Sequence, residues 1–324
     1  MTTAELRIFF SGRYMPFDGK VIEIIEEQLS LHSMNEAFIE KSIYYMEKNK
    51  VDVIYSESIP RLSESKLLQD MYFVLGNQEH LKKFRIGIVG TRKPDEYAVR
   101  TVTEIVKRYK NRDIATVSGF AEGIDSLVHK VSLDNSISTI AVLPCGFSND
   151  YPVSNKNLKK RIIDNGLLLT EYSPYIKPLK LNFIQRNHVI AALSDILIIT
   201  QGAMKSGTLS TFSHALKLNK QIFAIPGEIS NKLSFAPNYA IFRGAIPIYS
   251  KDILPGISIK DKCKIKITED ERNVLELAKK YKNINDMVNA KEFPYAVLIS
   301  VLTTLELKGL IVKGFNNKIS VLED

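Results

Sequence analysis

Residues 84–92, Phe-Arg-Ile-Gly-Ile-Val-Gly-Thr-Arg, decide the fold of this chain of 324 residues. This short apolar run ends in glycine, a pattern typical of a buried strand that turns tightly into a helix. Similar runs recur and alternate with amphipathic segments of helical length, so we predict strands at 86–89, 114–117, 138–143, 167–170, 196–200 and 222–225. Strands that are apolar on both faces and separated by helices predict an α/β fold with a doubly wound, mostly parallel, Rossmann-like sheet.

The flanking segments are predicted to form separate regions. We expect a helical N-terminal region at 1–52, a Rossmann-like domain at 53–250 with a further strand at 71–75, and a linker at 251–266. In residues 267–324, Thr268 and Glu271 form a capping box that begins the first of three helices, and a hairpin around Asn316-Asn317 follows them. Three helices and a hairpin are the outline of a winged-helix domain.

The charge of the chain is concentrated in the predicted sheet domain. The whole chain carries a net charge of +8, and residues 84–250 hold 21 Lys and Arg against 12 Asp and Glu, a net +9. Such a charge suits nucleic acid, an anionic membrane surface or a small polyanion. Neither an apolar run of about 18 residues nor a basic and apolar leader is evident, so we expect a cytoplasmic protein that does not engage a membrane.

Three glycine turns carry the candidate chemistry, and each follows a predicted strand. Gly90-Thr91-Arg92 combines a helix N-terminus with the planar fork of an arginine, which suits a phosphate. Ser118-Gly119 begins the second turn, and Lys205-Ser206-Gly207-Thr208 adds a point charge and hydroxyl groups in the third. Each turn also has a plain structural explanation, because βα turns favour glycine and helix starts favour Ser and Thr.

The spacing of these glycines argues against common nucleotide cofactors. The GxGxxG order of a dinucleotide site and the GxxxxGK[ST] order of a P-loop are both missing, so we predict no cofactor. Cys145 and Cys263 lack metal-ligand spacing, so we predict no metal. Asp125 and His129 lie four positions apart on a predicted helix, but no nucleophile can be assigned to them, and we predict no catalytic residue.

Two further segments, 151–156 and 182–188, alternate aromatic, amide and basic side chains. Aromatic faces stack on bases and cations contact phosphates, which is how proteins hold single strands without strict sequence readout. Either segment taken alone would be an ordinary loop.

Together these residues resemble the DNA processing protein A family, DprA or Smf, over residues 72–248. Eight motifs in the family's order carry the resemblance: Ile88-Val-Gly-Thr-Arg92, Ser118-Gly-Phe-Ala-Glu-Gly-Ile-Asp125, Thr139-Ile-Ala-Val-Leu-Pro-Cys-Gly146, Tyr151-Pro-Val-Ser-Asn155, Glu171-Tyr172, Phe183-Ile-Gln-Arg-Asn-His-Val-Ile-Ala191, Lys205-Ser-Gly-Thr-Leu-Ser-Thr211 and Phe223-Ala-Ile-Pro-Gly227. The sequence departs from the family at Asp95-Glu96-Tyr97-Ala98 and at His188, where an arginine is common.

The resemblance implies a single-stranded DNA-binding protein that protects incoming DNA, dimerises through the sheet domain, and loads the recombinase RecA during natural transformation. It implies that Arg92 and Lys205 contact phosphates, that Asn155 and Lys156 line the same groove, and that Arg186-Asn187 shape its wall. The full set of expected DNA-binding residues is Gly90, Thr91, Arg92, Ser118, Gly119, Asn155, Lys156, Arg186, Asn187, Lys205, Ser206, Gly207 and Thr208.

Two other classes of function stay open from the residues. One is a nucleotide-processing enzyme of the lysine-decarboxylase-like phosphoribohydrolase type, although Thr211 stands where those enzymes carry a catalytic glutamate. The other is a nucleotide-sensing Rossmann module. For the predicted winged helix we expect a protein contact, because residues 295–307 contain no Lys or Arg to grip duplex DNA.

Overall fold

The computed structural model describes residues 36–59, 71–250, 253–255, 268–281, 283–307, 310–313 and 319–321. The chain divides into two compact units, Met1–Ile257 and Ser258–Asp324. The helical pattern at 21–29, most of the predicted linker and the predicted Asn316-Asn317 turn lie outside the described residues. Among the described helices, none combines the length and the apolar character needed to cross a membrane.

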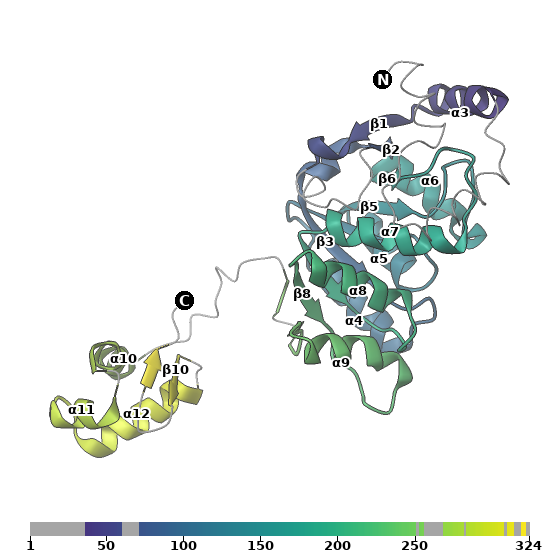
Figure 1. The fold of residues 1–324 in the computed structure, drawn as a ribbon. Coiled ribbons are helices and arrows are strands. Elements are labelled where there is room, and N and C mark those ends of the chain that lie inside the picture. Colours follow the sequence, from purple (N-terminus) through teal and green to yellow (C-terminus); the bar gives the residue numbers. More distant parts are fainter. Residues whose placement is uncertain are drawn as a thin grey trace. The chain divides into compact units, whose positions relative to one another are not determined.

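The first unit is built on a sheet of nine strands in the order β1-β2-β6-β5-β4-β3-β7-β8-β9 (Figure 1). The strands are β1 Asp52–Tyr55, β2 Met71–Gly76, β3 Phe84–Val89, β4 Ile114–Ser118, β5 Ser138–Leu143, β6 Leu167–Thr170, β7 Ile196–Ile199, β8 Gln221–Ala224 and β9 Ile246–Pro247. Pairing is parallel from β6 through β9 and antiparallel where β2 joins β6 and β1 joins β2. The predicted α/β, mostly parallel, Rossmann-like sheet is therefore confirmed.

Helices cover both faces of this sheet. They are α3 Glu36–Asn49, α4 Glu96–Lys107, α5 Ile124–Asp134, α6 Lys156–Asn165, α7 Lys180–Leu193, α8 Gly207–Lys217 and α9 Phe235–Phe242. Because side chains alternate along a strand, Leu197 of β7 packs with α7 and α8 on one face, whereas Ile196 and Ile198 pack with α4 and α5 on the other. This alternation is why the central strands are apolar throughout.

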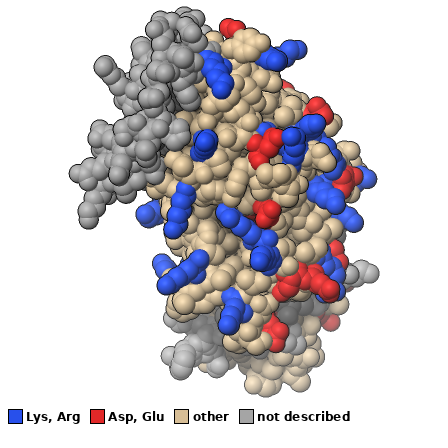
Figure 2. All heavy atoms as spheres, turned by 90° about the vertical axis from the view of Figure 1, so that its right-hand side faces the viewer, with Lys and Arg blue, Asp and Glu red and all other residues tan. Residues whose placement is uncertain are grey.

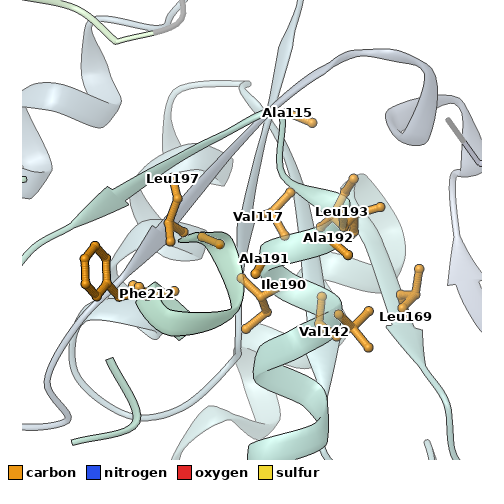
Figure 3. Close-up of a cluster of buried hydrophobic side chains, with 14 of the residues drawn as sticks. Ala115, Val117, Val142, Leu169, Ile190, Ala191, Ala192, Leu193, Leu197 and Phe212 are labelled. Carbon is orange, nitrogen blue, oxygen red and sulfur yellow. The ribbon is translucent and has the colours of Figure 1, made fainter. Parts of the chain in front are cut away.

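The C-terminal half of α7 lies in the middle of one core layer (Figure 3). Its residues from Arg186 to Leu193 are all buried, and Ile190 to Leu193 pack against strand residues such as Val117 and Val142. Burial of each large aliphatic side chain stabilises the fold by roughly 1.5–3 kcal/mol. This half of the helix is thus packed against the face of the sheet.

The second unit has its own small core. Helices α10 Glu269–Tyr281, α11 Ile284–Asn289 and α12 Tyr295–Leu307 are followed by the antiparallel pair β10 Ile311–Lys313 and β11 Ile319–Val321. The capping box forms as expected: Thr268 N donates to Glu271 Oε2 at 2.8 Å, and Glu271 N donates to Thr268 Oγ1 at 3.3 Å. The order of elements agrees with the sequence, and the assignment of a winged helix stays a prediction.

Candidate nucleic-acid interface

The turns that follow β3 and β4 are fastened to each other. Ile124 N donates to the carbonyl of Thr91 at 3.1 Å, and Ser118 Oγ donates to the carbonyl of Ile88 at 2.7 Å. Gly123 has φ +79°, and a Cβ there would lie 2.5 Å from the carbonyl carbon of Arg92. Glycine is therefore required where the two turns meet, and they form one surface at the carboxyl ends of the strands.

Gly90 serves the packing of this surface. A Cβ at Gly90 would lie 2.0 Å from Thr200 Oγ1 and 2.7 Å from Ile124 Cγ1. Side chains of the protein itself, Thr200 and Ile124, therefore fill the space that the missing Cβ of Gly90 leaves. Thr91 Oγ1 accepts a hydrogen bond from Lys93 N at 3.3 Å, which fixes the turn, and the Arg92 side chain is exposed.

A cluster of two aromatic rings and two cations, the exposed Arg92 and the buried Arg186, lies beside these turns. The guanidinium carbon of Arg92 lies 5.2 Å from the ring centroid of Phe183, and the ring of Tyr151 meets that of Phe183 edge-on with centroids 5.6 Å apart. The three residues come from the turn after β3, the segment after β5 and the first half of α7. An exposed guanidinium stacked on an aromatic ring is suited to hold a phosphate and an adjacent base together.

The segment 151–156 is anchored to the turn after β4. Asn155 Nδ2 donates to the carbonyl of Phe120 at 2.9 Å, and Ser154 Oγ donates to Glu122 Oε1 at 2.7 Å. Lys156 lies in the open, with its Nζ 3.0 Å from Asp150 Oδ2. An exposed ion pair of this kind contributes at most about 1 kcal/mol, so a phosphate can compete for the lysine.

Arg186 is a buried cation that joins the ends of two strands. Its Nη1 donates to the carbonyl of Gly119 and, at 3.0 Å, to that of Val142, and its side chain is 4% exposed. Asp125 lies next to it, since a Cβ on Gly119 would touch both side chains. Arg186 therefore lies beneath the surface, with its guanidinium carbon 5.9 Å from the ring centroid of Phe183. Asn187 is also buried, and its Nδ2 donates to the carbonyl of Gly207 at 3.3 Å.

Asp125 and His129 are both buried in this layer. Burial raises the pKa of the Asp125 carboxyl, and Arg186 opposes that rise. Burial, assisted by Arg186, lowers the pKa of His129 to about 3. His129 Nδ1 lies 2.7 Å from Thr139 Oγ1, so its ring is held inside the protein. The two side chains therefore belong to the interior polar network and have no open path to a substrate.

The third turn lies at the start of α8. Lys205 is exposed and forms no ion pair with any described residue, whereas Thr208 is buried. Ser206 precedes the helix without a side-chain capping bond, and Gly207 is open. Asp95 fastens this region to the first turn, because its Oδ2 accepts hydrogen bonds from Gln201 Nε2 at 2.6 Å and from Asn231 Nδ2 at 2.8 Å.

Most of the expected site residues fall into two groups, whereas Gly90, Thr91 and Ser206 are half-buried and Gly207 is exposed. Exposed cations stand at Arg92, Lys156 and Lys205. The buried members, which hold the loops in place, are Ser118, Gly119, Asn155, Arg186, Asn187 and Thr208. Phe183 and Tyr151 were missing from the expected set, although both lie in the segments whose alternating aromatic and basic residues pointed to strand binding.

Lys and Arg are unevenly distributed over the surface of the molecule. On the face of the molecule that Figure 2 shows, one half of the visible surface carries Lys and Arg with almost no Asp or Glu, and the two signs mix in the other half. No group of three or more His, Cys, Asp or Glu side chains within the described ranges is arranged to hold a metal ion. The surface is therefore suited to an extended anion.

Known proteins resemble this chain in sequence. Proteins named DNA processing protein DprA are 37% identical over 181 residues in Bacillus subtilis (56% of this chain and 61% of that protein) and 36% identical over 185 residues in Streptococcus pneumoniae (57% and 65%). Protein Smf of Escherichia coli is 31% identical over 212 residues (64% and 57%). Each match spans less than two thirds of the relative's own length.

Solved structures show the same fold. The crystal structure of DprA from Streptococcus pneumoniae superimposes with a TM-score of 0.62 at 31% identity, covering 68% of this chain and 77% of that one. DNA processing protein A from Helicobacter pylori, described for its single-stranded DNA binding mode, gives a TM-score of 0.57 at 27% identity, covering 62% and 92%.

A family model describes the sheet domain directly. The model of DNA recombination-mediator protein A matches residues 50–256, which is well over half of the chain. The matched range includes the three glycine turns and the Phe183 cluster. This chain belongs to the DNA recombination-mediator protein A family, whose relatives carry the names DprA and Smf.

Proposed function

We propose that this chain binds single-stranded DNA along the carboxyl ends of the strands in its first unit, protects it there and loads RecA onto it during natural transformation. The observation that carries the proposal is the cluster of Arg92, Phe183 and Tyr151. It places a charge for a phosphate beside an aromatic face for a base, which is the repeating chemistry of a single strand.

Three further facts support a polymer rather than a mononucleotide. The exposed cations Arg92, Lys156 and Lys205 come from three separate segments at the carboxyl ends of the strands. The amides of Asn155 and Asn187 are already bonded within the protein, so they leave base readout weak. The relative from Helicobacter pylori is described by its single-stranded DNA binding mode.

The test is the salt dependence of oligothymidylate binding, measured by fluorescence anisotropy. Arg92→Ala and Lys205→Ala should each weaken binding and flatten the slope of log affinity against log salt by about 0.7. Arg112→Ala and Lys107→Ala are matched controls, because both residues are exposed at the opposite ends of the strands. Unchanged affinity and unchanged slope in both test variants would contradict the assignment of Arg92 and Lys205 to the DNA-binding groove.

A second variant separates stacking from charge. Phe183→Leu should weaken binding about fivefold or more, since base stacking contributes roughly 1–3 kcal/mol per base. The salt slope should keep its wild-type value because no charge is lost. A flattened slope would show that the ring acts only by positioning Arg92.

The proposal describes a binding protein rather than an enzyme. Thr211, at the position of the phosphoribohydrolase glutamate, is buried, and its hydroxyl donates to the carbonyl of Gly207 at 3.3 Å. Incubation with nucleoside monophosphates should release no free base. Measurable release would support the enzymatic alternative.

Loading of RecA and self-association are the finer parts of the proposal. The family's description as a recombination mediator supports the first, and the exposed side chains of Phe242, Ile246 and Tyr249 near the β9 edge support a homodimer. Addition of the chain should shorten the lag of RecA assembly on DNA coated with single-strand-binding protein. Sedimentation should give twice the mass of one chain, and a persistent monomer would contradict the dimer.

A further inference from the structure

A cavity shares Lys205 with the site described so far and is otherwise lined by residues outside it. It has a volume of about 620 Å³ and lies between the loop that leads into α8 and the segment that leads into α9. Its walls include Met204, Lys205, Ile229, Lys232, Phe235 and Tyr239. The volume falls within the range of roughly 300–1,000 Å³ that small-ligand sites occupy.

The apolar part of the cavity offers an aromatic surface. The rings of Phe235 and Tyr239 are stacked, with centroids 5.8 Å apart and planes inclined by only 10°. Phe235 nevertheless remains 39% exposed, and Met204 beside it is 61% exposed. A planar ligand could extend this stack and cover the exposed carbon at the same time.

The charged part of the cavity is positive. Lys205 and Lys232 are both exposed, and neither forms an ion pair with a residue that the structure describes. Two free ammonium groups beside a planar apolar wall match the chemistry of a nucleotide unit, in which phosphates flank a flat base.

The side-chain amides in the cavity wall already form hydrogen bonds within the protein. Asn238 both accepts from Gly227 N at 3.1 Å and donates to the carbonyl of Gly227 at 3.0 Å. Asn231 donates to Asp95 Oδ2 at 2.8 Å and accepts from Leu233 N at 2.9 Å. These bonds make the wall rigid and leave stacking as the main attraction, so the cavity should accept any base.

We propose that this cavity is a subsite for one unpaired nucleobase of the bound strand, with the flanking phosphates at Lys205 and Lys232. The inference rests on the proposed function, because Lys205 belongs both to the expected phosphate groove and to the cavity wall. It extends the path of the strand from the Phe183 cluster past the start of α8, which Asn187 of α7 joins through Gly207.

The test compares two ligands on the full chain: oligothymidylate and an abasic oligomer of the same length, which has the backbone without bases. Phe235→Leu should weaken oligothymidylate binding about fivefold or more and leave binding of the abasic oligomer unchanged. Phe235→Tyr keeps the ring and should bind as the wild type does. Lys232→Ala should weaken binding of both oligomers.

Tyr55→Leu is the matched control, because Tyr55 is 45% exposed on β1, at the opposite edge of the sheet. It should change binding of neither oligomer. Equal binding of oligothymidylate by Phe235→Leu and the wild type would overturn the subsite, as would an equal loss for both oligomers. Loss of self-association without loss of base-dependent affinity would assign the cavity to a second copy of the chain instead.

These outcomes also separate the subsite from the proposed function. If Arg92→Ala and Lys205→Ala weaken DNA binding and Phe235→Leu does not, the proposed DNA-binding groove is supported. The cavity is then not a site for a base. If none of the three variants changes binding, the proposed function itself fails.

Discussion

At the scale of single residues, Arg186 shows how a cation can serve a binding surface without touching the ligand. It donates hydrogen bonds to the carbonyls of Gly119 and Val142, and it opposes the rise that burial causes in the pKa of Asp125. Arg186→Met should lower the free energy of unfolding by about 1–3 kcal/mol for each buried carbonyl left without its donor, and further because it removes the cation beside the buried Asp125. Urea unfolding measures this loss.

The double variant Arg186→Met with Asp125→Leu is the control for that prediction. It removes both charges, so it should recover part of the lost stability. A single variant as stable as the wild type would mean that the pair contributes nothing to the fold.

His129 makes stability depend on pH. Its pKa is about 3 in the folded protein, lowered by burial, against about 6.5 in the unfolded chain. The unfolded state therefore binds more protons between these values, so the stability contributed by neutral His129 is complete above pH 6.5 and is lost as the pH falls toward 3. The slope from this residue approaches about 1.4 kcal/mol per pH unit.

The measurement is urea unfolding of the wild type and His129→Gln between pH 7 and pH 5, a window of about two units in which this term changes. The variant should show a shallower loss of stability toward acid. Other histidines contribute equally to both proteins and cancel in the difference. Parallel curves would show that His129 titrates alike in the folded and unfolded chains.

At the scale of elements, the sequence predicted those strands and helices that have a periodic apolar pattern and turn residues at their ends. The central strands β5 and β6 begin and end where the apolar runs do. β1 was missed, because its four residues have exposed ends and only a half-buried middle, which leaves no pattern to detect. α3 lies within the predicted helical N-terminal region, and α10, α11 and α12 lie where three C-terminal helices were expected.

The sequence predicted which loops form the site, but it did not predict which of their side chains are buried. Nothing in the motif around Arg186 shows that α7 is buried on all sides from that residue onward, since a helix without a polar face has no amphipathic signal. Likewise, Gly90 suited a phosphate on sequence grounds, and only the packed fold shows Thr200 in that space. Burial is a property of the assembled layers, which one segment does not contain.

The capping box of α10 gives a prediction for one helix. Thr268→Ala removes the hydroxyl that accepts from Glu271 N, so it should destabilise α10 by about 1 kcal/mol. Hydrogen exchange of the α10 amides, followed by mass spectrometry, should become faster. Thr303→Ala, on an exposed face inside α12, is the control and should leave exchange in α10 unchanged.

At the scale of the whole molecule, we expect the first unit to bind DNA and the second unit to contact protein. α12 carries no Lys or Arg, and it begins with the exposed side chains of Tyr295 and Val297. Removal of residues 258–324 should therefore change the affinity for single-stranded and duplex DNA by no more than about twofold. Mobility shifts with both ligands measure this, and a marked loss of duplex binding would assign DNA contact to the second unit.

The last strand of the sheet limits how copies of this chain can meet. β9 consists of Ile246 and Pro247 alone, and proline has no N–H to offer to another strand. An edge so short and so poor in donors is a poor template for strand addition, the route by which open sheets aggregate. Contacts at this edge are therefore expected to form through side chains, so chains crowded along a DNA strand should not extend their sheets into one another through β9.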